Sequence, residues 1–213
     1  MDDDLRSRRI AYQRGTLDTA LVDADPIEQF RAWLGDALSA PEAVEPNAMS
    51  LATVSAAGRP SSRIVLLRQW DARGFVFFTN YESRKGLELA ENPQVALLFW
   101  WGALERQIRI EGVAERILEI ESDAYFASRP RGHQLSAWAS RQSAAVADKA
   151  VLDQAMARAA AAHPGEVSRP PYWGGYRVVP DRFEFWQGRP NRVHDRIAYE
   201  RVDVGWKVER LSP

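Results

Sequence analysis

The hydrophobic pattern begins with one amphipathic segment near the N-terminus. Apolar side chains recur at helical spacing at Ile27, Phe30, Trp33, Leu34 and Leu38. Asp25 and Pro26, directly before them, are a capping residue and a first-turn residue typical of a helix start. We therefore expect a helix from residue 26. The preceding residues 1–24 are polar and charge-rich and are expected to form a flexible N-terminal arm.

From residue 48 the pattern changes to short apolar runs separated by turns that contain Gly. Such runs fall at 49–54, 63–68, 75–79, 95–100 and 105–116, with a short helix expected over 83–89. A helical stretch over about 119–162 follows. Strands then return at 176–179 and 183–186 and in a hairpin over 197–210.

This order of elements favours a closed or partly closed antiparallel sheet. The chain lacks the strand–helix–strand alternation of a doubly wound fold. Strand-rich chains often close into barrels, because closure removes exposed edges. We expect a mainly β fold with flanking helices (α+β), with residues 25–213 in a single domain and the helical stretch at about 119–162 as an insertion in it.

Composition narrows the functional classes. The 213 residues carry 28 basic and 29 acidic side chains, which disfavours a non-specific nucleic-acid binder. The absence of Cys excludes disulfides, thiolate metal sites and cysteine nucleophiles, and it fits a reducing cytoplasm. No apolar run approaches the roughly 20 residues that cross a bilayer, and the acidic N-terminus lacks a leader profile. We expect a soluble cytoplasmic protein without a membrane partner.

Several common catalytic motifs are missing. The sequence contains no glycine-rich dinucleotide or Walker loop, no H-E-x-x-H and no G-x-S-x-G. The three histidines are too scattered to indicate a metal site. What remains is a set of Arg and aromatic residues near expected strand ends. Guanidinium groups suit a phosphate and flat side chains suit a ring, so a planar phosphorylated ligand is indicated.

Most of the local clusters allow two interpretations. Arg63 and Arg68 lie five positions apart, so a regular strand would project them from opposite faces, and the pair alone favours a solvated edge strand. The Ser83–Lys85 segment opens a helix and is equally compatible with an anion site or a solvated first turn. Arg129 and Arg131 lie where basic residues often only complement a helix dipole.

Two other segments favour function to different degrees. Gln142 and Ser143 are expected to start another helix, either as an anion pocket or as a simple cap. The segment 186–196 concentrates Trp, Arg and His side chains in one turn, which favours a ligand. In an extended segment Arg192 and His194 would share a face.

These residues belong to an ordered set of motifs. The set comprises Arg63-Ile64-Val65-Leu66-Leu67, Phe78-Thr79-Asn80, Ser83-Arg84-Lys85, Leu104-Glu105-Arg106-Gln107, Tyr125-Phe126-Ala127-Ser128-Arg129-Pro130-Arg131, Gln142-Ser143, Tyr172-Trp173-Gly174-Gly175-Tyr176-Arg177 and Phe185-Trp186-Gln187-Gly188 with Arg192-Val193-His194-Asp195-Arg196. In order and spacing, from about Arg9 to the C-terminus, it resembles the pyridoxamine/pyridoxine 5′-phosphate oxidase family. Each motif is weak alone, and the ordered set is strong.

The resemblance implies an antiparallel split β-barrel that binds FMN at a homodimer interface. The positions that it assigns to FMN are Arg63, Ile64, Val65, Leu66, Leu67, Arg68, Phe78, Thr79, Arg84, Lys85, Gln107, Gln142, Ser143, Trp186 and Arg196. The positions that it assigns to the substrate are Arg9, Tyr12, Arg68, Tyr125, Arg129, His133, Arg192 and His194. Arg192 and His194 are the implied catalytic pair, and no metal is implied.

The implied reaction oxidises pyridoxamine or pyridoxine 5′-phosphate to pyridoxal 5′-phosphate, with O2 as acceptor and H2O2 as product. Two positions depart from the family pattern. Arg68 stands where many relatives carry Lys, and His133 stands where a Ser often contacts the substrate phosphate. Arg changes the reach of the cation, and His makes phosphate contact sensitive to pH.

Three alternatives remain from the sequence. One is another flavin- or deazaflavin-dependent split-barrel reductase, which would have no reason to keep the segment Arg192–Arg196. The second is a non-catalytic flavin- or vitamer-binding module, disfavoured only by the completeness of the site. A nucleic-acid binder with a basic groove is disfavoured by the near-neutral charge.

Overall fold

Five α-helices and nine strands make up the computed structural model, which describes residues 10–213. The helices are α1 (Pro26–Ser39), α2 (Arg84–Glu91), α3 (Glu119–Ser128), α4 (Arg131–Ala139) and α5 (Lys149–Ala162). The strands are β1 (Ala48–Val54), β2 (Pro60–Leu66), β3 (Gln69–Asp71), β4 (Gly74–Asn80), β5 (Gln94–Trp101), β6 (Arg106–Arg116), β7 (Trp173–Gln187), β8 (Asp195–Arg201) and β9 (Trp206–Arg210). Arg9, expected at the site, lies outside the described residues.

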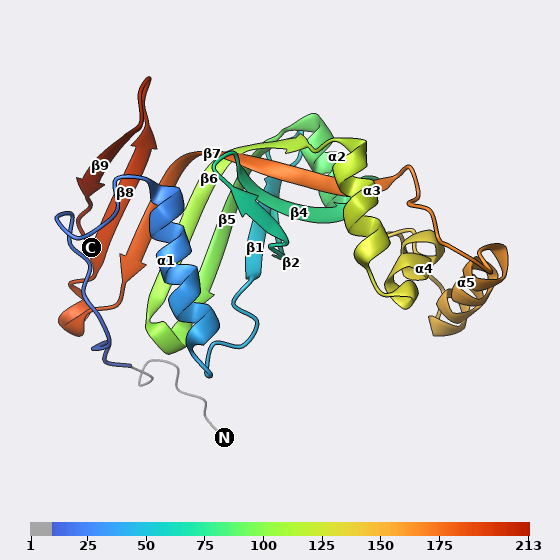
Figure 1. Ribbon diagram of the computed structural model, residues 1–213, viewed down its shortest axis with the longest axis horizontal. Helices are drawn as coiled ribbons and strands as arrows, with labels where there is room; N and C mark the ends of the chain where they lie inside the picture. Colours follow the sequence, from blue (N-terminus) through green and yellow to red (C-terminus); the bar gives the residue numbers. More distant parts are fainter. Residues whose placement is uncertain (1–9) are drawn as a thin grey trace. The chain divides into compact units, whose positions relative to one another are not determined.

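All nine strands belong to one sheet (Figure 1). Its main path runs β2-β1-β5-β6-β7-β4-β3, and β8 joins it by pairing with β7 and β9. The β4–β7 pair is antiparallel and places Phe78 opposite Gly175. The β7–β8 pair is also antiparallel and places Trp186 opposite Arg196.

One compact unit of the described chain comprises residues 10–50, 97–111 and 181–213. Its core forms where α1 places its apolar face on strand residues. Trp33 meets Phe185 edge-on with ring centroids 5.3 Å apart, and Phe30 lies 5.3 Å from Phe99. Asp25 caps α1 by accepting a hydrogen bond from the backbone N–H of Ile27, as the sequence predicts. Burying these large aromatic groups stabilises the helix against the sheet.

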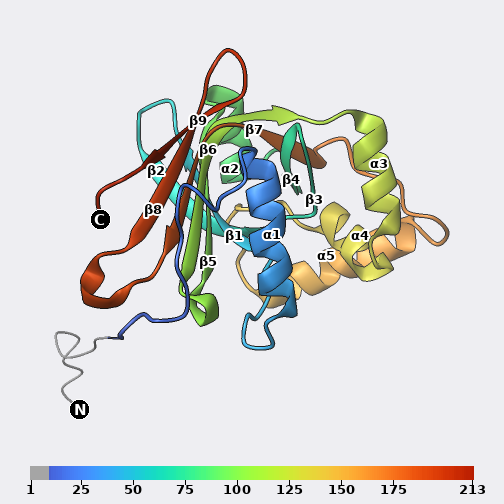
Figure 2. The ribbon, with the colours of Figure 1, turned by 60° about the vertical axis from the view of Figure 1, so that its left-hand side comes forward.

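The second compact unit comprises residues 51–96 and 112–180 and contains α2 to α5. Helices α4 and α5 lie side by side in both ribbon views (Figure 2). Phe126 of α3, Leu135 of α4 and Ala159 of α5 form a core with Trp173 at the start of β7. The helical stretch expected at 119–162 is therefore three helices, broken at Arg129-Pro130 and at residues 140–148.

The structure corrects the sequence prediction in two strands. The strand expected over 63–68 runs from Pro60 to Leu66 and ends before Leu67 and Arg68. The two strands expected at 176–179 and 183–186 are one strand, β7, that continues through Pro180. Gly112 allows the close approach of β6 at this point, because a Cβ there would lie 2.2 Å from the carbonyl oxygen of Val179.

The expected helix start at Gln142 is also wrong. Gln142 and Ser143 form a turn, with Ser143 in the left-handed region at φ 73°. Helix α5 begins only at Lys149, where Asp148 accepts a hydrogen bond from the N–H of Val151. The side chain of Asp148 caps α5 and therefore sets where this helix starts.

Among residues 10–213, no helix is both long and apolar enough to cross a membrane.

Candidate functional site

A cavity of about 650 Å³ opens in the second unit, between strand ends and the helices α2, α3 and α4. Most of its lining was predicted from the sequence: Arg63, Ile64, Val65, Leu66, Arg68, Phe78, Thr79, Lys85, Tyr125, Arg129, His133 and Gln142. Ser128, Pro130 and Trp173 complete it and were not predicted as site residues. Trp173 had a signal, since it lies within a motif that carries the resemblance.

The cavity gathers cationic side chains from distant parts of the sequence. Arg63 and Arg68 come from the end of β2 and the residues after it, Lys85 from α2 and Arg129 from the end of α3. A regular strand would have separated Arg63 from Arg68. Because β2 ends at Leu66, both arginines line the same cavity, although β2 is an edge strand and Arg68 is exposed, as the solvated-edge interpretation expects.

Lys85 lies in the first turn of α2 and is held by neutral oxygens. Its Nζ donates to Oε1 of Gln142 at 2.8 Å and to Oγ1 of Thr79 at 3.2 Å. Burial and the charge of Arg63 lower the pKa of Lys85 to about 8, against a smaller opposite effect of Glu88. Among residues 10–213, Lys85 forms no ion pair with a carboxylate, which is the role that an anionic ligand would fill.

Aromatic rings form one wall of the cavity. Phe78 and Tyr125 stack with centroids 3.8 Å apart and planes inclined by 16°, and Trp173 lies 5.5 Å from Phe78 in the same stack. The guanidinium carbon of Arg129 lies 4.5 Å from the centroid of Trp173. This cation–π contact fixes the plane of Arg129 at the cavity wall.

Arg129 carries a buried donor that no described residue satisfies. Its Nη1 is inaccessible to solvent and has no hydrogen-bond partner. Burial, then the charge of Arg68, lower the pKa of Arg129, while Tyr125 opposes them. A buried unpaired N–H is costly, so this donor indicates a place for a ligand acceptor.

Arg84 and Ser143 lie beside the cavity rather than in it. Together with Gln142 they line a neighbouring hollow of about 400 Å³. The backbone N–H of Arg84 donates to Oγ of Ser143 at 3.2 Å, at the N-terminus of α2 where Ser83 is the cap. The hydroxyl of Ser143 therefore accepts a hydrogen bond from one of the N–H groups at the N-terminus of α2 that have no partner inside the helix. A carboxylate or phosphate oxygen can accept from such N–H groups as well.

The first unit holds a second cavity, of about 680 Å³. It is lined by Tyr12, Trp186, Arg192 and His194 with Ile10, Ala11, Arg189 and Asn191. Tyr12 contacts Trp186 edge-on at 5.6 Å and His194 at 5.8 Å. A Cβ at Gly188 would lie 2.7 Å from Cγ of Tyr12, so glycine permits this contact between the arm and the turn.

The protonation of His194 follows from its contacts. Its Nδ1 accepts a hydrogen bond from the backbone N–H of Arg189 at 3.1 Å. Burial, and then the charge of Arg192, lower its pKa. The imidazole is therefore neutral at pH 7 and carries its proton on Nε2.

The segment around Arg192 forms a turn, as expected, and is not extended there. Residues Pro190–Arg192 form a short 3-10 turn, and Asn191 and Arg192 adopt left-handed φ angles of 58° and 62°. Arg192 and His194 nevertheless line the same cavity. A left-handed Arg is strained, and such strain is often found at functional positions.

Three predicted residues line neither the two cavities nor the hollow beside the first one. Leu67 is 5% exposed and belongs to the core, and Gln107 lies on β6. The guanidinium of Arg196 forms a two-pronged ion pair with the buried Glu184 at 2.9 and 3.1 Å. Across residues 10–213, no group of His, Asp and Glu side chains is arranged to hold a metal ion.

The strand order defines this chain as an antiparallel split β-barrel protein, and its cavity is lined by cationic and aromatic side chains. Family models then give the closer assignment. Residues 36–162 match the pyridoxamine 5′-phosphate oxidase model, and residues 173–213 match the pyridoxine 5′-phosphate oxidase C-terminal dimerisation region. The chain belongs to the pyridoxamine 5′-phosphate oxidase family.

Curated relatives agree over almost the whole length. The chain is 55% identical over 206 residues to pyridoxine/pyridoxamine 5′-phosphate oxidase 1 of Ralstonia nicotianae, covering 96% of this chain and 97% of the relative. It is also 55% identical over 212 residues to the pyridoxine/pyridoxamine 5′-phosphate oxidase of Burkholderia thailandensis, covering 98% and 99%.

Solved structures support the fold. PhzG from Burkholderia lata 383, crystallised with tetrahydrophenazine-1-carboxylic acid, is 34% identical with a TM-score of 0.86, covering 93% of this chain and 100% of PhzG. A pyridoxamine 5′-phosphate oxidase-related, FMN-binding protein from Nostoc punctiforme is 19% identical with a TM-score of 0.71, covering 86% and 97%. The second similarity concerns the fold alone.

Proposed function

We propose that this protein oxidises pyridoxamine 5′-phosphate and pyridoxine 5′-phosphate to pyridoxal 5′-phosphate with FMN, using O2 and releasing H2O2. Relatives at 55% identity that carry this name support the substrate class. The observation that carries the proposal is the cavity itself. Four cations surround it beside an aromatic stack, and one of them, Arg129, keeps a buried N–H without a partner.

The residues present fit FMN. Arg63, Lys85 and the N-terminus of α2 with Arg84 and Ser143 offer charged and neutral donors suited to a terminal phosphate. We assign the phosphate of the substrate to three further residues that line the cavity, Arg68, Arg129 and His133. When bound, FMN supplies the hydride acceptor that the oxidation needs and passes electrons on to O2.

Arg192 and His194 act on the reacting end of the substrate in this proposal. Because Nδ1 of His194 is occupied by the N–H of Arg189, only its Nε2–H is available as a donor. The fixed charge of Arg192 stabilises negative charge near the amine or alcohol, and together with burial, the larger cause, it lowers the pKa of His194. Both residues orient the substrate and form no covalent bond with it.

A homodimer would complete the site. The match of residues 173–213 to a dimerisation region supports assembly of two chains. We propose that the turn containing Arg192 and His194 in one protomer closes over the cavity of its partner, with two equivalent sites in each dimer.

One assay tests the reaction. The purified protein should bind FMN and turn yellow, and added pyridoxamine 5′-phosphate should yield aldehyde and H2O2 in equal amounts. A yellow protein that forms neither product would be the flavin-binding module. A protein that instead required a deazaflavin would be the rival reductase.

The similarity to PhzG is tested with its own ligand. Tetrahydrophenazine-1-carboxylic acid carries a carboxylate and no phosphate, so it should compete weakly for a cavity lined by Arg68, Arg129 and His133. Faster oxidation of this compound than of pyridoxamine 5′-phosphate would contradict the proposed substrate.

A further inference from the structure

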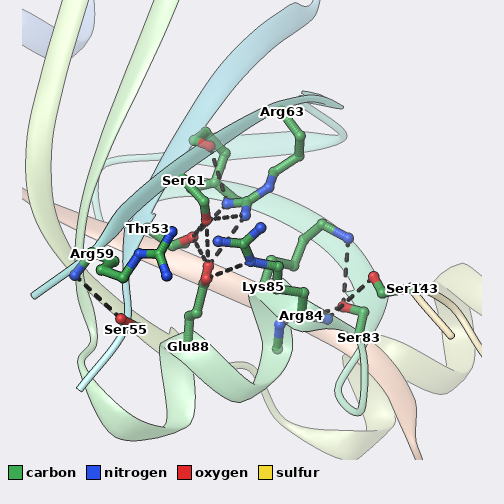
Figure 3. A network of polar contacts seen from close by, with 12 residues as sticks. Thr53, Ser55, Arg59, Ser61, Arg63, Ser83, Arg84, Lys85, Glu88 and Ser143 are labelled. Atoms are coloured by element: carbon green, nitrogen blue, oxygen red, sulfur yellow. Dashed lines mark hydrogen bonds and ion pairs between the residues drawn. The ribbon is translucent and has the colours of Figure 1, made fainter. Parts of the chain in front are cut away.

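Glu88 is a buried carboxylate at the centre of a polar network beside the candidate flavin site (Figure 3). Its Oε2 accepts hydrogen bonds from the hydroxyls of Thr53 at 2.5 Å and Ser61 at 2.6 Å. The same oxygen lies 3.2 Å from Nη2 of Arg63, and Oε1 accepts from Nε of Arg84 at 2.9 Å. One carboxylate therefore contacts two of the arginines that the sequence assigns to FMN.

The network fixes the end of a long side chain. Arg63 donates through Nη1 to Oγ1 of Thr53 and to the carbonyl oxygen of Leu51, and through Nη2 to Oγ of Ser61 at 2.6 Å. The two hydroxyls accept from Arg63 and donate to Glu88, so each links the guanidinium to the carboxylate. This arrangement holds Arg63 in one orientation before any ligand binds, which reduces the entropy lost on binding.

Cationic side chains outnumber Glu88 within its own network. Arg63, Arg84 and Lys85 carry three positive charges against the single carboxylate of Glu88, and the charged residues Arg141, Glu82 and Glu91 also line the hollow beside them. Burial alone would raise the pKa of Glu88, but hydrogen bonds from Ser61, Thr53, Arg84 and Arg63 lower it to about 2. Glu88 is therefore ionised at every pH at which the protein would work.

Simple electrostatics and positioning predict opposite effects of Glu88. A carboxylate near an anion site repels the anion, so its removal should strengthen binding. If Glu88 instead orients Arg63 and Arg84, its removal should weaken binding, because the two guanidinium groups would repel each other and lose their alignment. The depth of the network favours the second effect, since each arginine contacts a different oxygen of Glu88.

We propose that Glu88 is a positioning residue that aligns Arg63 and Arg84 for the phosphate of FMN. The proposal rests on the proposed function, because it takes FMN as the ligand. Glu88 itself contacts the arginines and need not contact the cofactor.

The test compares two flavins that differ only in the phosphate. FMN and riboflavin are titrated into flavin-stripped full-length protein, and quenching of flavin fluorescence gives each affinity. Glu88→Gln, which keeps the side-chain shape, should weaken FMN binding about tenfold and leave riboflavin binding within twofold. Glu91→Gln is the matched control, because Glu91 lies exposed on the same helix and accepts only the backbone N–H of Ala56.

A pH profile adds a readout that a general folding defect would not change. Lys85 faces Arg63 and Glu88 and bonds Thr79, Ser83 and Gln142. Because the Glu88 carboxylate raises the pKa of Lys85, Glu88→Gln should move the alkaline loss of FMN affinity to lower pH. Should Glu88→Gln fail to fold, Ser61→Ala removes one link to Arg63 and should weaken FMN binding several-fold without affecting riboflavin.

The outcomes separate the two proposals. Tighter FMN binding by Glu88→Gln, an equal loss for both flavins, or an unchanged preference for FMN would overturn the positioning role alone. If the unaltered protein binds FMN no better than riboflavin, the proposed function fails, and the role of Glu88 fails with it.

Discussion

At the scale of single residues, the surroundings of Lys85 make its charge depend on pH in an accessible range. Its pKa of about 8 means that the ammonium is complete below pH 7 and lost as the pH rises through 8. We predict that FMN affinity is constant from pH 6 to 7 and falls about tenfold by pH 9.5. Titrations of flavin fluorescence across this range would measure it.

The control is Lys85→Met, which should bind FMN more weakly and show a flat profile over the same range. A full pH dependence in this variant would assign the titration to another group.

The free energy of unfolding should depend on pH in the opposite sense to FMN affinity. Without ligand, the unfolded chain, with a Lys pKa near 10.5, binds more protons between pH 8 and 10.5, so stability should rise there.

Arg129 tests the substrate side of the cavity. We predict that Arg129→Met raises KM for pyridoxamine 5′-phosphate about 30-fold while flavin content stays unchanged, because the unpartnered Nη1 is lost and the flavin donors are kept. Steady-state kinetics and absorbance at the flavin band measure the two quantities. Arg158→Met, on the exposed side of α5, is the control and should behave like the unaltered protein.

Single residues also show which parts of the site could be predicted from the sequence. Most residues that line the cavity were predicted, but through the ordered set of motifs that resembles the family, since most local clusters alone also fit a solvated or capping role. Glu88 was not, since its spacing of four from Arg84 resembles an ordinary surface ion pair on a helix. Glu88 is buried against Thr53 and Ser61 because of how the strands pair, and the local spacing of residues does not predict this pairing.

At the scale of elements, prediction succeeded where a local signal marked a boundary. The caps Asp25 and Ser83 fixed the starts of α1 and α2. It failed at β7, which was expected as two strands at 176–179 and 183–186 but continues through Pro180. No sequence signal marks the left-handed conformation of Arg192, because residues other than glycine seldom adopt it.

The N-terminal arm supplies a prediction at this scale. Glu105 accepts the backbone N–H groups of Gln13 and Arg14 through Oε2 at 2.7 and 2.9 Å, next to Tyr12. We predict that Glu105→Gln speeds amide exchange at these two residues about tenfold, because hydrogen bonds to a charged acceptor become bonds to a neutral one. Hydrogen exchange followed by NMR would measure it, with unchanged rates in α4 and α5 as the internal control.

At the scale of the whole molecule, a mixing experiment tests whether two chains share each site. We predict that Arg129→Met and Arg192→Ala, each nearly inactive at limiting substrate, recover activity when unfolded and refolded together. In a mixed dimer one site would carry both changes and the other neither, so random assembly restores about one quarter of the sites. No recovery on mixing would show that both residues act within one chain.

The division of the chain into two compact units limits how recombination can exchange parts of the gene. The backbone passes between the two compact units at residues 50–51, 96–97, 111–112 and 180–181, and each passage falls inside a strand, namely β1, β5, β6 and β7. No linker separates the units at any of these points. Neither unit is a contiguous stretch of the sequence, so a single recombination crossover cannot exchange one of them alone.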